Sequence, residues 1–71
     1  MIRNVADAAA FVTKEAGFTP EATLLRMARD GSGPPFVMVD GEPIFDHPDL
    51  VAFAAKRKAE FQRRRAARRQ G

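Results

Sequence analysis

The amino-acid sequence predicts one small domain that is mainly α-helical and carries a single β-hairpin. Two observations indicate helices, because a proline follows a capping residue at Thr19-Pro20 and at His47-Pro48. A third indicates the hairpin, because β-type residues run from Phe36 to Val39 and the turn pair Asp40-Gly41 follows them. A chain of 71 residues is also too short for two domains or for a large enzyme with a deep cleft.

The first helix is expected from Val5 to Ala16, with Asn4 as its N-cap and Gly17 as its stop. Apolar residues recur there at the helical period, so that one stripe and its neighbours hold Val5, Ala8, Ala9, Phe11 and Val12. Phe18, directly after the stop, is expected to fill a gap between elements as a short apolar plug.

A second helix is expected from Pro20 to about Arg29, ending before Gly31, with Thr19 as its N-cap and Pro20 in its first position. Its buried stripe is predicted to be Leu24, Met27 and Ala28. Its opposite face is predicted to present Ala22, Thr23, Leu25, Arg26 and Arg29. Two helices joined by a short turn that contains glycine predict a helix-turn-helix.

The hairpin follows a loop, residues 31–35, whose glycines and prolines exclude a helix or strand interior. The turn Asp40-Gly41 favours type I′ and leads into a return strand over residues 42–45. Pro43 has no N–H to donate to a ladder, so this strand is expected at a sheet edge. The inner face of the hairpin is predicted to hold Phe36, Met38 and Phe45.

A third helix is expected to open at residues 46–49, capped by Asp46 or His47, with Pro48 in its first position. Its core-facing stripe would be Leu50, Phe53 and Ala54. The pattern can continue to about Arg69, but apolar surface is scarce past Ala55. We therefore expect a folded domain over residues 1–57 and a basic tail over residues 58–71 that is helical or disordered.

Charge is divided unevenly along the chain. Residues 1–55 hold four bases and eight acids, a net charge of −4, and residues 56–71 hold eight bases and one acid, a net charge of +7. A basic tail on a mildly acidic body indicates a nucleic-acid or acidic-membrane partner, and the alternative is a solvated tail that aids solubility. A membrane-surface helix is disfavoured, because Phe61 is the only large apolar residue between 56 and 70.

Enzymatic and metal sites have little support in the sequence. Cysteine is absent and His47 is the only histidine, and there is no nucleophile elbow, phosphate-binding glycine loop or zinc spacing. Asp46 and Asp49 flank His47, but helix capping explains both carboxylates. We therefore expect no enzyme, no cofactor and no metal. The absence of a long apolar run and of a signal-peptide profile predicts a cytoplasmic protein.

The order of these elements resembles the AlpA and excisionase group of small winged helix-turn-helix proteins, relatives of the MerR DNA-binding domain. The resemblance covers residues 4–57 and rests on Val5-Ala6-Asp7-Ala8-Ala9, Thr19-Pro20, Gly31-Ser32-Gly33-Pro34-Pro35-Phe36-Val37, Gly41, Phe45, Asp49-Leu50 and Phe53. The chain departs from the family in two places. Glu42-Pro43 follows the turn where the family usually carries arginine or lysine, and the first helical region is longer, through Thr13-Lys14-Glu15.

The resemblance implies a mainly α fold of three helices with a two-stranded wing, and a sequence-specific DNA-binding protein. It would act as an excisionase, also called a recombination directionality factor, which binds and bends attachment-site DNA and steers an integrase toward excision. The alternatives are an AlpA-type transcriptional regulator and, from another class, a protein-interaction module. The expected partners are double-stranded DNA and an integrase or recombinase. The uneven charge adds the hypothesis of head-to-tail self-association along DNA.

The candidate DNA contacts fall into three groups. In the second helix, Arg26 is expected to contact a base edge, since a guanidinium pairs with guanine, and Arg29 to contact a phosphate. Around them, hydrogen bonds or backbone contacts to DNA are expected from Thr19, Pro20, Thr23 and, in the hairpin turn, Gly41. The tail is expected to bind phosphates through Lys56, Arg57, Lys58, Arg63, Arg64, Arg65, Arg68 and Arg69.

Overall fold

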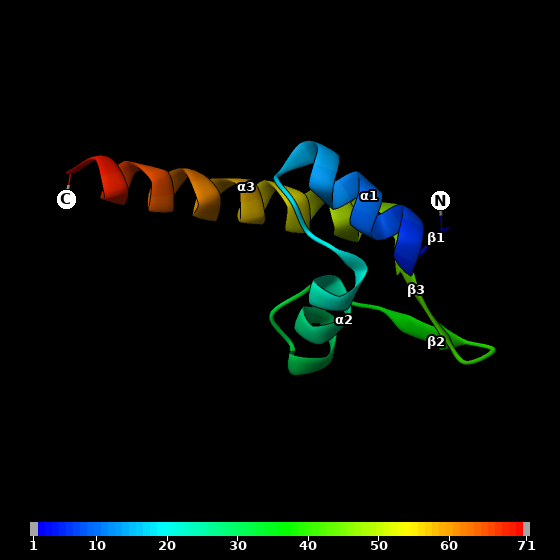
Figure 1. Cartoon of the computed structure of the whole chain (residues 1–71). Coiled ribbons are helices and arrows are strands. Elements are labelled where there is room, and N and C mark those ends of the chain that lie inside the picture. The colour runs from blue at the N-terminus through cyan, green and yellow to red at the C-terminus, as the bar shows by residue number, and fades with distance from the viewer. Residues whose placement is uncertain (1, 71) are drawn as a thin grey trace.

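The computed structural model describes residues 2–70, and describes side chains over residues 2–66. Three helices and a three-stranded antiparallel sheet follow in the order β1 (Ile2–Asn4), α1 (Val5–Glu15), α2 (Glu21–Asp30), β2 (Val37–Val39), β3 (Glu42–Asp46) and α3 (His47–Gln70) (Figure 1). The prediction of a mainly helical domain with a small β element is confirmed at this level. Arg68 and Arg69 lie outside the residues whose side chains are described.

Helix α1 begins at Val5, as the sequence predicts, and ends at Glu15, one residue before the predicted end, with Ala16 as its C-cap. The side chain of Asn4 accepts a hydrogen bond from the backbone N–H of Asp7 at 2.8 Å, which caps the helix. After the helix, Gly17 adopts a φ of +144°, and a Cβ added there would lie 2.9 Å from the ring of Phe61. The α1–α2 turn therefore lies directly against α3, with no space for a side chain at Gly17.

The sheet differs from the prediction in two respects. The N-terminal residues form a strand, β1, that the sequence did not reveal, and the strand order β1-β3-β2 places β3 in the centre rather than at an edge. Pro43 is tolerated there because of its place in the ladder. Val39 and Glu42 form the hydrogen-bonded pair that flanks the turn, so the next pair, Met38 and Pro43, is a non-hydrogen-bonded one. Its missing N–H therefore faces the β1 side, and the last β1 pair is Asn4 with Ile44, so the ladder needs no hydrogen bond from Pro43.

The β2–β3 hairpin has the predicted turn but a different buried face. Asp40 and Gly41 both have positive φ, 52° and 81°, as a type I′ turn requires. Phe45 is fully buried and packs against half-buried Phe36, whereas Met38 is 60% exposed. The prediction that Met38 is buried is wrong because the end of the hairpin extends beyond the helices (Figure 1).

The core lies where α1, α2, β3 and the first half of α3 meet. It consists of Ala8, Ala9, Val12, Leu24, Ala28, Phe45, Leu50 and Phe53, with Val5, Phe11, Met27 and Phe36 packed at its margin. The core-facing stripes predicted for all three helices are therefore confirmed. Val5, Phe11 and Met27 belong to these stripes but are half-buried rather than fully buried. Phe18 is 77% exposed, so the prediction that it plugs a gap is wrong: its side chain lies at the surface although the next residue, Thr19, is fully buried.

Helix α3 runs without a break from His47 to Gln70, a length of about 36 Å at 1.5 Å per residue. Its C-terminal half projects from the body as a helix, which is one of the two alternatives expected from the sequence (Figure 1). Although apolar surface is scarce past Ala55, the helix is held to the body there, because Phe61 contacts the α1–α2 turn at Gly17 and Arg57 bonds to Thr19. The boundary predicted at residue 57 thus falls inside a continuous helix.

Candidate nucleic-acid interface

Two arginines stand on the exposed face of α2. Arg26 and Arg29 are both exposed and lie three residues apart, on one side of the helix. Ala22 is exposed beside them and Leu25 is half-buried, and with Asp30 these residues line a shallow hollow. No hydrogen bond or ion pair of either guanidinium is found among the residues that the structure describes. Both cations are thus available to an external anion.

Asp30, the acid next to this face, is held by another residue. Its carboxylate accepts hydrogen bonds from the hydroxyl of Ser32 at 2.6 Å and from the backbone N–H of Ser32 at 3.0 Å. These two bonds hold the pKa of Asp30 below its ordinary value, and the charge of Arg26 lowers it further. Because Ser32 orients the carboxylate toward the helix end, Asp30 stays ionised near Arg26 without bonding to it.

Thr19 does not cap α2 and is not available to DNA. The residue at the N-cap is Pro20, and α2 has no side-chain cap. Thr19 is fully buried: its hydroxyl donates to the carbonyl of Gly17 at 2.9 Å and accepts from the Nε of Arg57 at 2.8 Å. Its backbone N–H and carbonyl both bond to the hydroxyl of Thr13. The prediction that Thr19 contacts DNA is therefore wrong, since every polar group of the residue is already bonded inside the domain.

Arg57 is a structural residue rather than a free cation. Besides its bond to Thr19, its Nη1 donates to the Sδ of Met27 at 3.5 Å, and its guanidinium lies 4.7 Å from the ring centroid of Phe61. These contacts join α3 to the α1–α2 turn and to α2. These contacts disfavour a phosphate contact by Arg57, because its Nε and Nη1 hold α3 to the α1–α2 turn and to α2.

The position of α2 is fixed from its other end as well. The backbone N–H of Gly33 donates to the carbonyl of Met27 at 2.8 Å, so the loop after α2 folds back on the helix. A Cβ at Gly33 would lie 2.8 Å from the backbone nitrogen of Ala28, so only glycine allows this approach. With Leu24 fully buried, α2 is held at its start, its middle and its end.

The remaining candidates in the body lie at the surface. Pro20 is exposed and Thr23 is half-buried, at the start of the exposed face of α2. Gly41 is exposed at the tip of the hairpin, where its neighbours Asp40 and Glu42 are also exposed. The hairpin therefore presents two carboxylates and no base at its tip, so a contact to a phosphate there would have to come from the backbone.

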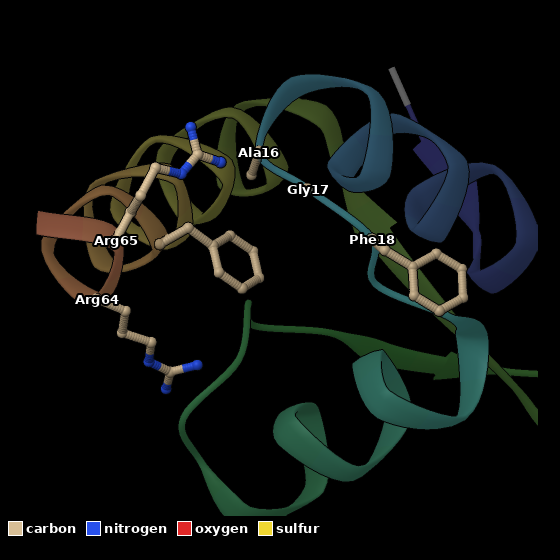
Figure 2. Close-up of a pocket in the computed structure, with 6 residues that line it drawn as sticks. Ala16, Gly17, Phe18, Arg64 and Arg65 are labelled. Carbon is tan, nitrogen blue, oxygen red and sulfur yellow. The ribbon is translucent and has the colours of Figure 1, made fainter. Parts of the chain in front are cut away.

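The cations of α3 divide into two sets. Lys56, Lys58 and Arg63 are exposed. Arg64 and Arg65 are also exposed, but with Phe18 and Phe61 they line a hollow beside the α1–α2 turn (Figure 2). The guanidinium of Arg64 lies 6.0 Å from the ring centroid of Phe61. No pattern in the sequence indicates this hollow, because its lining residues come from the α1–α2 turn and from α3, which are far apart in the chain.

His47 has a structural role. Its Nδ1 accepts a hydrogen bond from the Nε of Arg3 at 3.1 Å, and its ring packs edge-on against Phe11 at 5.1 Å between centroids. These contacts join β1, α1 and the start of α3. Within residues 2–66 no group of three or more metal-ligating side chains lies close enough to hold a metal ion. No helix in the described part of the chain combines the length and apolar character of a membrane span.

Comparison of the chain with known families, proteins and structures finds no similar protein. No protein-family model matches the chain, and neither a curated protein nor a solved structure is significantly similar to it. The candidate interface therefore rests on geometry alone: an exposed pair of guanidiniums on a helix anchored at both ends, a projecting hairpin, and a long helix with exposed cations.

Proposed function

We propose that the chain is a non-enzymatic DNA-binding protein that uses α2 as the recognition helix of a winged helix-turn-helix, with β2 and β3 as the wing. The observation that supports this most strongly is the exposed face of α2. Arg26 and Arg29 have no hydrogen-bonding partner there within the described residues, while the opposite face is anchored in the core. An α-helix with its side chains is about 10–12 Å wide, and the major groove is about 12 Å wide.

The rigidity of α2 favours a role in recognition. A helix that reads base edges must hold its side chains in one position relative to the rest of the protein. Arg57 bonds to both the turn before α2 and a residue within it, and Gly33 closes the loop after it. These bonds do not involve the exposed face, so DNA can bind there without disturbing them.

The wing contributes little electrostatic affinity in this proposal. Asp40 and Glu42 at the tip repel phosphates, so contact there is limited to the backbone of Gly41. Most non-specific affinity then comes from Lys56, Lys58 and Arg63 on α3, which neutralise phosphates and release counterions. The binding should weaken steeply as salt is raised.

Within DNA-binding proteins, we propose an excisionase, or recombination directionality factor, which binds attachment-site DNA and steers an integrase toward excision. The support is the ordered resemblance over residues 4–57. An AlpA-type transcriptional regulator would use the same contacts at a promoter. An excision reaction with the integrase and attachment sites of the encoding element distinguishes them: an excisionase raises the yield of excised product, and a regulator leaves it unchanged.

DNA binding itself is tested by fluorescence anisotropy with labelled attachment-site duplex at several salt concentrations. The proposal predicts saturable binding, tighter to this duplex than to a random one, and a logarithmic affinity that falls linearly with the logarithm of salt concentration. Absence of binding to both duplexes at low salt would contradict it. Binding without salt dependence would also contradict it and would favour a protein-interaction module.

A further inference from the structure

The sheet has a face with four exposed or half-buried aliphatic residues that no part of the described chain covers. Directly paired residues of antiparallel strands share a face, so Val37 lies beside Ile44 and Val39 lies beside Glu42. In β1, Asn4 is the partner of Ile44, and Ile2, two residues earlier, lies on the same face as Asn4. Phe45 and Phe36 occupy the opposite, core-facing side. We call the set on this face the outer sheet face: Ile2, Asn4, Val37, Val39, Glu42, Ile44 and Asp46.

This face has the composition of a contact surface. Ile2, Val37 and Val39 are 72%, 63% and 48% exposed, and Ile44 is half-buried between them. An antiparallel sheet that meets water on one side normally places polar residues on that side. Here Asn4, Glu42 and Asp46 are polar, but the other four residues of the face are β-branched and aliphatic. Glu42 and Asp40 add negative charge at the end of the face.

A surface of complementary character lies on another part of the molecule. The hollow lined by Ala16, Gly17, Phe18, Phe61, Arg64 and Arg65, named here the Phe18 pocket, combines exposed aromatic surface with two cations (Figure 2). Phe18 is 77% exposed. The wing and the C-terminal half of α3 lie at opposite ends of the molecule, so one chain cannot bring the two surfaces together (Figure 1).

We propose that the outer sheet face of one copy docks in the Phe18 pocket of a second copy. Apolar surface is then buried on both sides, and Glu42 and Asp40 of one protomer lie near Arg64 and Arg65 of the next. Contact of two outer sheet faces would gather the carboxylates of both copies without a cation from either face, and contact of two pockets would gather four arginines. Like charges thus disfavour both symmetric arrangements.

The contact is heterologous, because it uses a different surface on each protomer. Every added copy leaves one outer sheet face and one Phe18 pocket free, so copies join in an open series unless the rotation closes a ring. Arg64 and Arg65 are thereby assigned to a protein contact, whereas Lys56, Lys58 and Arg63 remain available to DNA. The docking needs no DNA and does not rest on the proposed function.

Two double variants test the docking, each of which changes only exposed residues of one surface. Val37→Lys/Val39→Lys places cations on the outer sheet face, and Phe18→Ser/Arg64→Ser removes the aromatic and one cation from the pocket. Val51→Lys is the matched control, because Val51 is a 47% exposed valine on α3 that belongs to neither surface. Far-UV circular dichroism verifies that all variants are folded.

The readout is sedimentation equilibrium without DNA, at protein concentrations up to about 1 mM. The wild type and Val51→Lys are expected to rise above the monomer mass of 7.8 kDa as concentration increases. Each double variant alone is expected to associate about tenfold or more weakly. An equimolar mixture of the two double variants keeps one intact surface of each kind, so it should form a one-to-one pair and nothing larger.

Several results would overturn the proposal. These are a wild type that stays monomeric throughout, a double variant that associates as strongly as the wild type, or a mixture that remains monomeric while the wild type associates. The same samples also separate this proposal from DNA binding. If the Phe18→Ser/Arg64→Ser variant binds DNA normally but does not self-associate, the docking surface is distinct from the DNA-binding surface, as the proposal requires.

Discussion

The Nε of Arg57 donates a hydrogen bond to the buried Oγ1 of Thr19 at a distance of 2.8 Å. These residues are 38 positions apart, and their bond joins α3 to the turn that precedes α2. Because the same guanidinium also contacts Met27 and Phe61, one side chain fixes the position of the recognition helix in our proposal.

The first prediction concerns Thr19. Thr19→Val keeps the shape of the side chain but removes its hydroxyl. That hydroxyl accepts a hydrogen bond from Arg57 and donates one to the carbonyl of Gly17. We expect the free energy of unfolding to fall by about 1–3 kcal/mol, measured by urea denaturation. Thr23→Val on the outer side of α2 is the control and should change stability by about 0.5 kcal/mol or less. Equal stability of both variants would show that the Thr19–Arg57 bond contributes nothing.

The second prediction separates the two arginines of α2. Arg26→Ala should weaken binding to the specific duplex by about 1–3 kcal/mol and barely affect binding to random DNA, since a base contact carries sequence preference. Arg29→Ala should weaken both by a similar factor, since a phosphate contact does not. Fluorescence anisotropy with both duplexes measures the four differences. If Arg26→Ala reduces both affinities equally, Arg26 contacts the backbone and not a base.

The third prediction concerns the cations of α3. Replacing Lys56, Lys58 and Arg63 with glutamine should lower affinity for all duplexes alike. The slope of logarithmic affinity against logarithmic salt concentration should become shallower by about 0.9 for each phosphate that the variant no longer neutralises. None of the three side chains is buried, so stability should be nearly unchanged. An unaltered slope would mean that these residues do not reach the DNA.

The fourth prediction is a pH effect at the end of α2. The bonds from Ser32 lower the pKa of Asp30, so they stabilise the folded state when the carboxylate is charged. This stabilisation is present above the unfolded-state pKa and is lost as the pH falls through the lower folded-state pKa. Ser32→Ala should therefore raise the pKa of Asp30, measured by NMR titration of its carboxyl carbon. An unchanged pKa would contradict the assignment to Ser32.

Local signals were sufficient to predict much of the fold. The Asn4 cap, the stop at Gly17 and the Asp40-Gly41 turn each depend on neighbouring residues, and each is present in the structure. Strand β1 could not be predicted, because Ile2, Arg3 and Asn4 carry no local strand pattern and become a strand only by pairing with β3. The central position of Pro43 has the same origin.

The candidate site was predicted less completely. Periodicity placed Arg26 and Arg29 on the exposed side of α2, since it follows from which residues face the core. Composition alone could not distinguish Arg57 from its neighbours in a basic run, because its bonds to Thr19 and Met27 come from distant parts of the chain. The exposure of Phe18 was likewise hidden, since Phe18 lies outside any periodic element.

Direct mapping of the DNA contact is the best test of the proposal that α2 is the recognition helix. Backbone amide shifts of the ¹⁵N-labelled protein should be recorded while attachment-site duplex is added, at a protein concentration low enough to keep the free chain monomeric. We expect the largest amide shift changes in α2, at Ala22, Thr23, Arg26 and Arg29. Smaller shift changes are expected at Gly41, Lys56 and Lys58. Changes confined to the outer sheet face, with α2 unaffected, would contradict it.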